Sequence, residues 1–327
     1  MEKINEIVNL FDLQNTKLQN EKIRILYSWK DNFSNKEFDI LMKVLKNYSY
    51  YSERAVGLTY KKIIDKEFNS QKMNDTENLY LPLTTKEMRT ESSEVLFYQF
   101  YKSNDINTNY VKYANSSNEL QKIYKAWSKY AKIVDQNGDL VNNSNEKIKE
   151  KLERDYIGIK RIFLIDDFVG TGSSVKNFLR QNNITIKELT ALKLEINFIF
   201  IAGTNFGFDE IQQTIESYEL ENVSLYYFEK IIEFFDIHLN NKVLVENEIN
   251  IIEKKLNELY SIHNIRPGKY NRNTAISSFH NAPNCNIPLL INSTDSWDAL
   301  FERKKRYKTR EVDKSTLKDN LRRLRNG

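Results

Sequence analysis

The hydrophobic residues of the chain follow two different periods. From residue 1 to about residue 70 they recur at helical spacing. Phe38, Leu41, Met42 and Leu45 lie three, four and seven positions apart, which places them on one face of an amphipathic helix. From about residue 78 short apolar runs alternate with helical patterns. The sequence therefore predicts a helical N-terminal region followed by an α/β region.

Four apolar runs are rich enough in β-branched and aromatic residues to predict buried strands: 79–83, 162–165, 194–202 and 223–228. Pro82 indicates a sheet edge or a strand end, and 109–114 is a possible further short strand. Helices are predicted between these runs, one of them capped by Ser92 or Ser93 and others at 119–133, 175–179 and 209–217. This alternation predicts a doubly wound, mainly parallel sheet, whose ligands bind beyond the carboxyl ends of the strands.

The C-terminal third departs from this rhythm. A helical pattern at 251–259 precedes a loop at 279–290 that contains Pro283, Pro288 and several asparagines. The predicted organisation is a helical accessory domain at 1–75, the α/β core at 76–235, a C-terminal extension at 236–310 and a basic tail at 311–327. The polar, turn-rich stretch 135–146 is predicted to be disordered or a mobile flap over a ligand.

Composition narrows the protein class. With 40% hydrophobic residues the chain can bury a folded core. Cys285 is the single cysteine, which excludes an intrachain disulfide and a cysteine-based metal cluster, and three histidines argue against a zinc site. No stretch approaches the roughly 18 apolar residues that span a bilayer, and the N-terminus has no secretory pattern. We expect a soluble cytoplasmic protein without a membrane partner.

The net charge of +4 is unevenly placed. Residues 301–327 hold eleven Lys or Arg against four Asp or Glu, so this segment carries +7 and the other 300 residues sum to −3. Such a segment predicts binding to nucleic acid or to an acidic partner surface. The alternative is a solvated C-terminal helix that packs through Leu317, Leu321 and Leu324.

The most informative stretch for function is R-I-F-L-I-D-D-F-V-G-T-G-S-S at 161–174. A buried strand runs into Asp166 and Asp167, and a small-residue loop made of Gly170, Thr171, Gly172, Ser173 and Ser174 leads into a helix. Loop N–H groups and a helix N-terminus bind phosphate, and glycine allows close approach of the backbone. Carboxylates accept hydrogen bonds from sugar hydroxyls or help to hold a divalent cation. The alternative is an acidic turn without a ligand, and a P-loop kinase fits less well because no lysine follows in the required place.

At these residues the chain resembles the type I phosphoribosyltransferases, whose signature is a hydrophobic strand, two acidic residues, two apolar residues and a Thr-Gly-rich phosphate loop. The resemblance implies that Asp166 and Asp167 face the ribose hydroxyls of phosphoribosyl pyrophosphate (PRPP). It also implies that residues 170–174 hold its 5′-phosphate and that Mg²⁺ accompanies its pyrophosphate near the two aspartates. The segment H-N-A-P-N-C-N-I-P-L-L at 280–290 is similar to the C-terminal region of a subgroup found in bacterial conflict and antiphage (retron-like) operons.

Three further residues are candidates for substrate binding. By position, Lys86 and Arg89 correspond to the loop that holds pyrophosphate in type I enzymes, but no motif supports the match, which favours reading them as exposed, solvated charges. His280 is a candidate to contact a base or to transfer a proton, and its alternative role is to tie down the Asn-Pro loop.

The leading functional hypothesis is a PRPP-dependent transferase that displaces pyrophosphate from the ribose C1′, in a role implied by the resemblance to antiphage effectors. An ATPase or a reverse-transcriptase element is an expected partner. The alternatives are a module that senses PRPP or a nucleotide without turnover, and a nucleic-acid-binding scaffold that acts through the basic tail.

Overall fold

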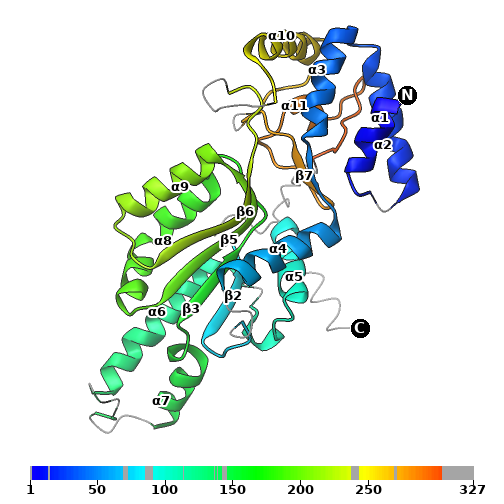
Figure 1. Ribbon diagram of the computed structural model, residues 1–327. Helices are drawn as coiled ribbons and strands as arrows, with labels where there is room; N and C mark the ends of the chain where they lie inside the picture. Colours follow the sequence, from blue (N-terminus) through cyan, green and yellow to red (C-terminus); the bar gives the residue numbers. More distant parts are fainter. Residues whose placement is uncertain are drawn as a thin grey trace, which may run out of the picture.

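The computed structural model describes residues 2–13, 15–68, 73–84, 91–112, 114–135, 137, 139–141, 146–236, 243–268 and 271–303 of the 327-residue chain. These residues form a sheet-containing lobe and a smaller, mainly helical lobe, which meet above the upper ends of the strands in Figure 1. No helix in the described ranges is both long and apolar enough to cross a membrane.

The sheet lobe is built on parallel strands, as the apolar runs predict. Its strands are β2 (Asn78–Pro82), β3 (Arg161–Ile165), β4 (Phe168–Val169), β5 (Glu195–Thr204) and β6 (Val223–Ile231). The strand β2 pairs with β3, β3 and β4 both pair with β5, and β5 pairs with β6, all of them parallel. Pro82 is the last residue of β2, so the prediction of a strand end is confirmed. The predicted strand at 109–114 is reduced to a 3-10 helix (Thr108–Tyr110) and a single parallel bridge between Tyr80 and Val111.

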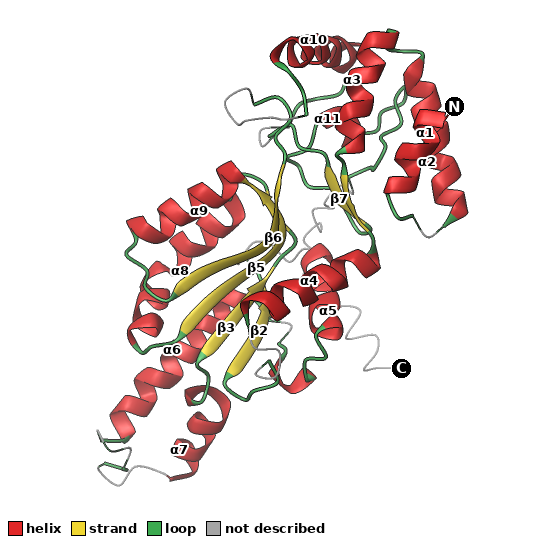
Figure 2. Cartoon of the chain, viewed as in Figure 1, coloured by secondary structure: helices red, strands yellow, loops and turns green. Residues whose placement is uncertain are grey.

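Helices cover both faces of this sheet (Figure 2). One face packs on α6 (Ser116–Ile133), α8 (Ser173–Ala191) and α9 (Asn205–Ser217), and the other packs on α4 (Glu53–Glu67) and α5 (Glu91–Ser103). Residues Ser92 and Ser93 lie in the first described turn of α5. The strands β2, β3 and β5 are almost entirely buried because both of their faces are covered, which explains their continuous apolar runs, whereas most residues of β6 are partly exposed.

The order of the strands defines where a ligand can bind. The chain passes from β2 to Val111 on one side of β2, and later from β3 to β5 and β6 on the other side. The direction of the crossovers therefore reverses between β2 and β3. In doubly wound sheets the carboxyl ends of the strands on either side of such a reversal form the ligand crevice. Thr84 follows β2, and Asp166 and Asp167 follow β3, at this edge.

The stretch after α6 lies at the opposite edge of the sheet. Val134 and Leu140 form a short antiparallel bridge there, and α7 (Glu146–Leu152) and a π-helical turn (Glu153–Ile157) lead directly into the amino end of β3. Figure 1 shows α7 at the far end of the sheet from the helical lobe. The prediction of a flap over a ligand at 135–146 is therefore wrong for the described residues of that stretch, because a segment at the amino ends of the strands cannot cover a site at their carboxyl ends.

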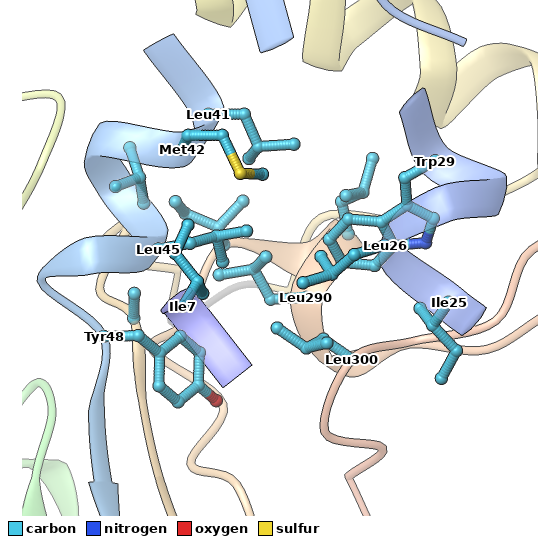
Figure 3. Close-up of a cluster of buried hydrophobic side chains, with 14 of the residues drawn as sticks. Ile7, Ile25, Leu26, Trp29, Leu41, Met42, Leu45, Tyr48, Leu290 and Leu300 are labelled. Carbon is cyan, nitrogen blue, oxygen red and sulfur yellow. The ribbon is translucent and has the colours of Figure 1, made fainter. Parts of the chain in front are cut away.

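The helical lobe joins the two ends of the described chain. It contains α1 (Glu2–Leu10), α2 (Thr16–Lys30), α3 (Asn35–Lys46), α10 (Glu246–Ile262) and α11 (Pro288–Ile291). Their apolar faces form one core, in which Leu26 and Leu45 from the first helices lie with Leu290 and Leu300 (Figure 3). The amphipathic pattern of 38–45 falls in α3, which carries a capping box from Ser34 and Glu37.

A two-stranded parallel ladder lies where the lobes meet. The strand β1 (Ser49–Tyr51) pairs with β7 (Ile276–Ser278), which lies far from it in sequence. Immediately after β1, Ser52 caps α4, and α4 packs on the sheet. The pairing therefore fixes the C-terminal segment against the carboxyl edge of the sheet.

Candidate functional site

The acidic pair interrupts a strand that otherwise keeps its register. Ile165 lies opposite Ile199 and Phe168 lies opposite Ala202, so β4 continues the alignment of β3 along β5. Asp166 and Asp167 occupy the gap between β3 and β4, and both are partly exposed, while the strand residues before them are buried. The carboxylates therefore stand at the carboxyl edge of the sheet, as the sequence predicts.

Local hydrogen bonds orient both aspartates. The Asp166 carboxylate accepts from the N–H of Asp167 at 3.0 Å, and the Asp167 carboxylate accepts from the N–H of Phe168 at 2.7 Å. Each bond uses one carboxylate oxygen, and a carboxylate has about four acceptor positions. These two backbone hydrogen bonds alone therefore do not fill the acceptor positions of either carboxylate.

The loop that follows has the backbone conformation of an anion site. Gly172 has φ of +70° and is the N-cap residue of α8. It has no side chain to cap the helix, whereas α2, α3, α4, α6 and α9 each have a side-chain cap. The first amides of α8 therefore have no acceptor from the cap residue, and the positive end of the helix dipole is directed at the loop.

Two loop side chains contact each other at this helix start. The hydroxyls of Thr171 and Ser173 lie 2.8 Å apart, and Ser174 is exposed. The structure thus brings Asp166, Asp167 and residues 170–174 together on one strand-loop-helix connection, in the arrangement that the motif predicts.

Close backbone packing explains the two loop glycines. A Cβ on Gly172 would lie 2.7 Å from the Gly207 carbonyl oxygen in α9, and a Cβ on Gly170 would lie 2.9 Å from the Cβ of Cys285. The Gly170 carbonyl accepts from the Thr204 hydroxyl, which also caps α9. The loop is therefore held between α9 and the C-terminal segment, and Cys285, fully buried, is part of its support.

Buried polar contacts fix the residues that follow β2. The N–H of Thr84 donates to the Ser116 hydroxyl at 3.0 Å, and the N–H of Ser116 donates to the Thr84 hydroxyl at 3.0 Å. A further bond joins Ser117 in α6 to Asn182 in α8 at 2.9 Å. Lys86 and Arg89 lie outside the described residues. Their predicted role stays a prediction.

His280 lies in the turn after β7. Hydrogen bonds between Ser278 and Asn281 hold this turn, and the N–H of Phe279 donates to the carbonyl of Tyr51 at 2.8 Å. Tyr51 in turn contacts the Phe168 ring at 5.8 Å. These two contacts connect Phe279, the neighbour of His280, through Tyr51 to Phe168, the neighbour of Asp167. The predicted contact of His280 with a base stays a prediction. The basic tail at 311–327 also lies outside the described residues.

Sequence reasoning missed the tyrosines that surround the acidic pair. The Tyr60 hydroxyl in α4 donates to the backbone carbonyl of Asp166 at 3.0 Å, and the Tyr51 hydroxyl donates to the Glu229 carboxylate at 2.5 Å. Both tyrosines come from the first 60 residues, to which no motif assigns chemistry. Only the tertiary structure, in which α4 and β1 lie against the sheet, shows that these tyrosines contact the site.

A buried ion pair near the loop was also not predicted. Arg272 pairs with Glu233, whose side chain is 2% exposed, and the guanidinium stacks on the Phe206 ring at 4.1 Å. Phe206 belongs to the first turn of α9, and the N–H of Arg272 donates to the Cys285 carbonyl at 2.8 Å. Burial raises the pKa of Glu233, against the charge of Arg272. The pair fastens the C-terminal segment to the start of α9, the helix that packs against the loop at 170–174.

Among the described residues, no group of three or more His, Cys, Asp or Glu side chains could hold a metal ion alone. Asp166 and Asp167 are two adjacent carboxylates. Mg²⁺ prefers six oxygen ligands and is usually held by one or two carboxylates together with substrate phosphates and water. The donor set therefore fits a cation that arrives with a phosphorylated substrate.

Comparison with known proteins gives one match. The model of the PRTase-CE family matches residues 26–303, which include the acidic pair, the loop, Tyr60 and the C-terminal segment through His280 and Cys285. No curated protein and no solved structure matches the chain significantly.

Proposed function

The chain belongs to the PRTase-CE family, a family of phosphoribosyltransferase-type domains, and from this membership and the site we propose that it binds PRPP and transfers the phosphoribosyl group. The observation that carries the proposal is the connection from β3 to α8. It places two carboxylates directly before a helix start whose N-cap is a glycine with φ of +70°.

Each part of the connection matches one part of the substrate. The amides of residues 170–174 and the dipole of α8 suit the 5′-phosphate. Asp166 and Asp167 suit the ribose hydroxyls, and their negative charge favours the positive charge that develops on the ribose ring as pyrophosphate leaves C1′. In this proposal Lys86 and Arg89 neutralise the pyrophosphate, and His280 contacts the acceptor. Mg²⁺ bound to the pyrophosphate oxygens supplies the remaining positive charge.

The test is release of pyrophosphate from PRPP in the presence of Mg²⁺ and a cell extract that supplies the acceptor. We expect release by the wild-type protein, and loss of at least about a hundredfold in the double variant Asp166→Asn, Asp167→Asn, because the carboxylates face the reacting ribose. The double variant should fold with an unchanged or slightly raised Tm, since two adjacent like charges are removed. A folded double variant with full activity would contradict the proposal.

The second candidate is a PRPP-sensing or nucleotide-sensing module without turnover. The observation that favours it is that the phosphate loop and acidic pair are fully formed, and sensing requires only these. If the protein bound PRPP tightly but released no pyrophosphate with any acceptor, the sensing module would be favoured over the transferase.

We also propose a role in antiphage defence, together with an ATPase or reverse-transcriptase partner, on the resemblance of residues 280–290 to conflict-system proteins. Plaque counts on bacteria that carry the gene with its neighbouring genes, compared with the Asp166→Asn, Asp167→Asn version, test this role. Equal plaque counts with both versions would exclude an effector role for the site. Binding of the tail to nucleic acid is tested by comparing the full chain with a variant that lacks residues 311–327: the full chain should bind in a strongly salt-dependent way, and the shortened variant should fold but lose this binding.

A further inference from the structure

We propose that Tyr60 is a positioning residue of the site: its hydroxyl holds the Asp166 carbonyl out of the regular strand ladder and so sets the direction of the acidic pair. The proposal rests on the proposed function, because the acidic pair is assigned there to the ribose hydroxyls. It adds a residue of α4, from the N-terminal part of the chain, to the machinery of the sheet.

The ladder between β3 and β5 is irregular at the acidic pair. The N–H of Asp166 donates to the Ile199 carbonyl at 3.1 Å. In a regular parallel ladder the Asp166 carbonyl would then accept from the N–H of Ile201. Instead Ile201 donates to the Asp167 carbonyl at 2.9 Å. The regular ladder therefore skips the Asp166 carbonyl, to which the Tyr60 hydroxyl donates instead.

Tyr60 is the hydrogen-bond donor to this carbonyl. Its side chain is fully buried, and its hydroxyl donates to the Asp166 carbonyl at 3.0 Å. The Phe100 ring of α5 contacts the Tyr60 ring edge-on at 5.3 Å. Burial, and then the charges of Asp167 and Asp166, raises the pKa of Tyr60 well above its ordinary value, so the hydroxyl remains a donor at all physiological pH values.

Removal of the hydroxyl has a defined structural consequence. Without the Tyr60 hydroxyl the Asp166 carbonyl loses its hydrogen bond at 3.0 Å, and the N–H of Ile201 is the alternative donor that a regular ladder would supply. If the carbonyl turned to Ile201, the peptide between Asp166 and Asp167 would rotate. That peptide carries the N–H that binds the Asp166 carboxylate, so both side chains would change direction.

The chain offers a matched control in Tyr80. Tyr80 is also fully buried, and its hydroxyl donates to the Met73 carbonyl at 2.7 Å. Met73 precedes β2, at the amino edge of the sheet, away from the acidic pair. Tyr80→Phe therefore removes the same atom and the same kind of donated bond as Tyr60→Phe, together with a bond that the Tyr80 hydroxyl accepts from the Asn78 side chain at 3.1 Å. A purely structural role predicts the same effect on the sugar preference for both variants.

The experiment is a calorimetric titration of ribose 5-phosphate and of 2-deoxyribose 5-phosphate into the wild-type protein, Tyr60→Phe and Tyr80→Phe. The wild-type protein should prefer the ribose compound, because the acidic pair accepts from its 2′-hydroxyl. Tyr60→Phe should bind ribose 5-phosphate about tenfold more weakly and bind the deoxy compound nearly as before. Tyr80→Phe should keep the wild-type preference, and thermal unfolding should show that both variants fold.

The outcomes separate the positioning role from the proposed function. A wild-type preference that Tyr60→Phe retains, or an equal loss for both sugars in both variants, overturns the positioning role alone. A wild-type protein that binds neither sugar phosphate nor PRPP overturns the proposed function as well. If Tyr60→Phe does not fold, Phe100→Leu serves instead, because it loosens the ring while keeping the hydroxyl. It should lower the ribose preference, and an unchanged preference would count against the proposal.

Discussion

At the scale of single residues, the backbone geometry of the loop at 170–174 was predictable and its surroundings were not. Asp166, Asp167 and the loop glycines form one continuous motif, and local backbone requirements alone explain Gly172, whose φ is +70°. Tyr60 and Arg272 come from segments more than 90 residues away from the motif. Their roles depend on tertiary packing, which hydrophobic periodicity does not encode.

Gly172→Ala should damage both the fold and the site. A left-handed conformation costs a non-glycine residue about 1–2 kcal/mol, and the added Cβ would lie 2.7 Å from the Gly207 carbonyl oxygen. We expect a lower Tm and loss of PRPP binding. Gly158→Ala is the control, because Gly158 has φ of −68° and open surroundings. An alanine at 172 with wild-type stability and affinity would show that the loop does not need this conformation.

At the scale of elements, the order of strands and helices followed from the apolar runs because parallel strands covered on both faces must be apolar throughout. The flap predicted at 135–146 was wrong for the described residues of that segment, because a polar, turn-rich sequence has the same appearance at either edge of a sheet. Buried ion pairs were also beyond prediction. The Glu119 carboxylate at the start of α6, 3% exposed, accepts from Lys112 at 2.8 Å and from Lys122 at 2.9 Å. The ion pair with Glu119 links Lys112, which follows the bridge at Val111, to α6.

Glu119→Gln should destabilise the protein by about 1–3 kcal/mol at neutral pH. Although burial opposes it, the hydrogen bonds and charges of Lys112 and Lys122 lower the pKa of Glu119. A carboxyl whose pKa is lower in the folded state contributes stability above its unfolded pKa, about 4.3. The difference in Tm from the wild type should therefore shrink as the pH falls below about 4. Glu219→Gln, which alters an exposed pair with Lys187, is the control. A difference that stays constant from pH 7 to pH 3 would refute this role.

At the scale of the whole molecule, the helical lobe is assembled from both ends of the described chain. Trp29 of α2 stacks on Trp297 with ring centroids 5.0 Å apart, and the Trp29 indole N–H donates to the Asp298 carbonyl at 2.9 Å. The same C-terminal segment supports the phosphate loop through Cys285. The hydrophobic pattern predicted helices at the N-terminus, but it could not show that they share a core with residues 287–301.

A double-mutant cycle tests this shared core. Trp29→Ala and Trp297→Ala should each cost about 3–5 kcal/mol of unfolding free energy, and the double variant should cost less than the sum by about 0.5–1.5 kcal/mol because the rings touch. Urea unfolding followed by circular dichroism gives these values. Trp29→Ala combined with Trp127→Ala, in α6 of the other lobe, should be additive. Additivity in both pairs would mean that the two tryptophans do not interact.

The central claim is that the connection from β3 to α8 binds a phosphoribosyl compound through Asp166, Asp167 and the loop at 170–174. Isothermal titration of PRPP with Mg²⁺ into the wild-type protein and the double variant Asp166→Asn, Asp167→Asn tests it most directly. We expect saturable binding to the wild-type protein and at least about a hundredfold weaker binding to the folded double variant. A wild-type protein that does not bind PRPP, or a double variant that binds it equally well, would contradict the claim.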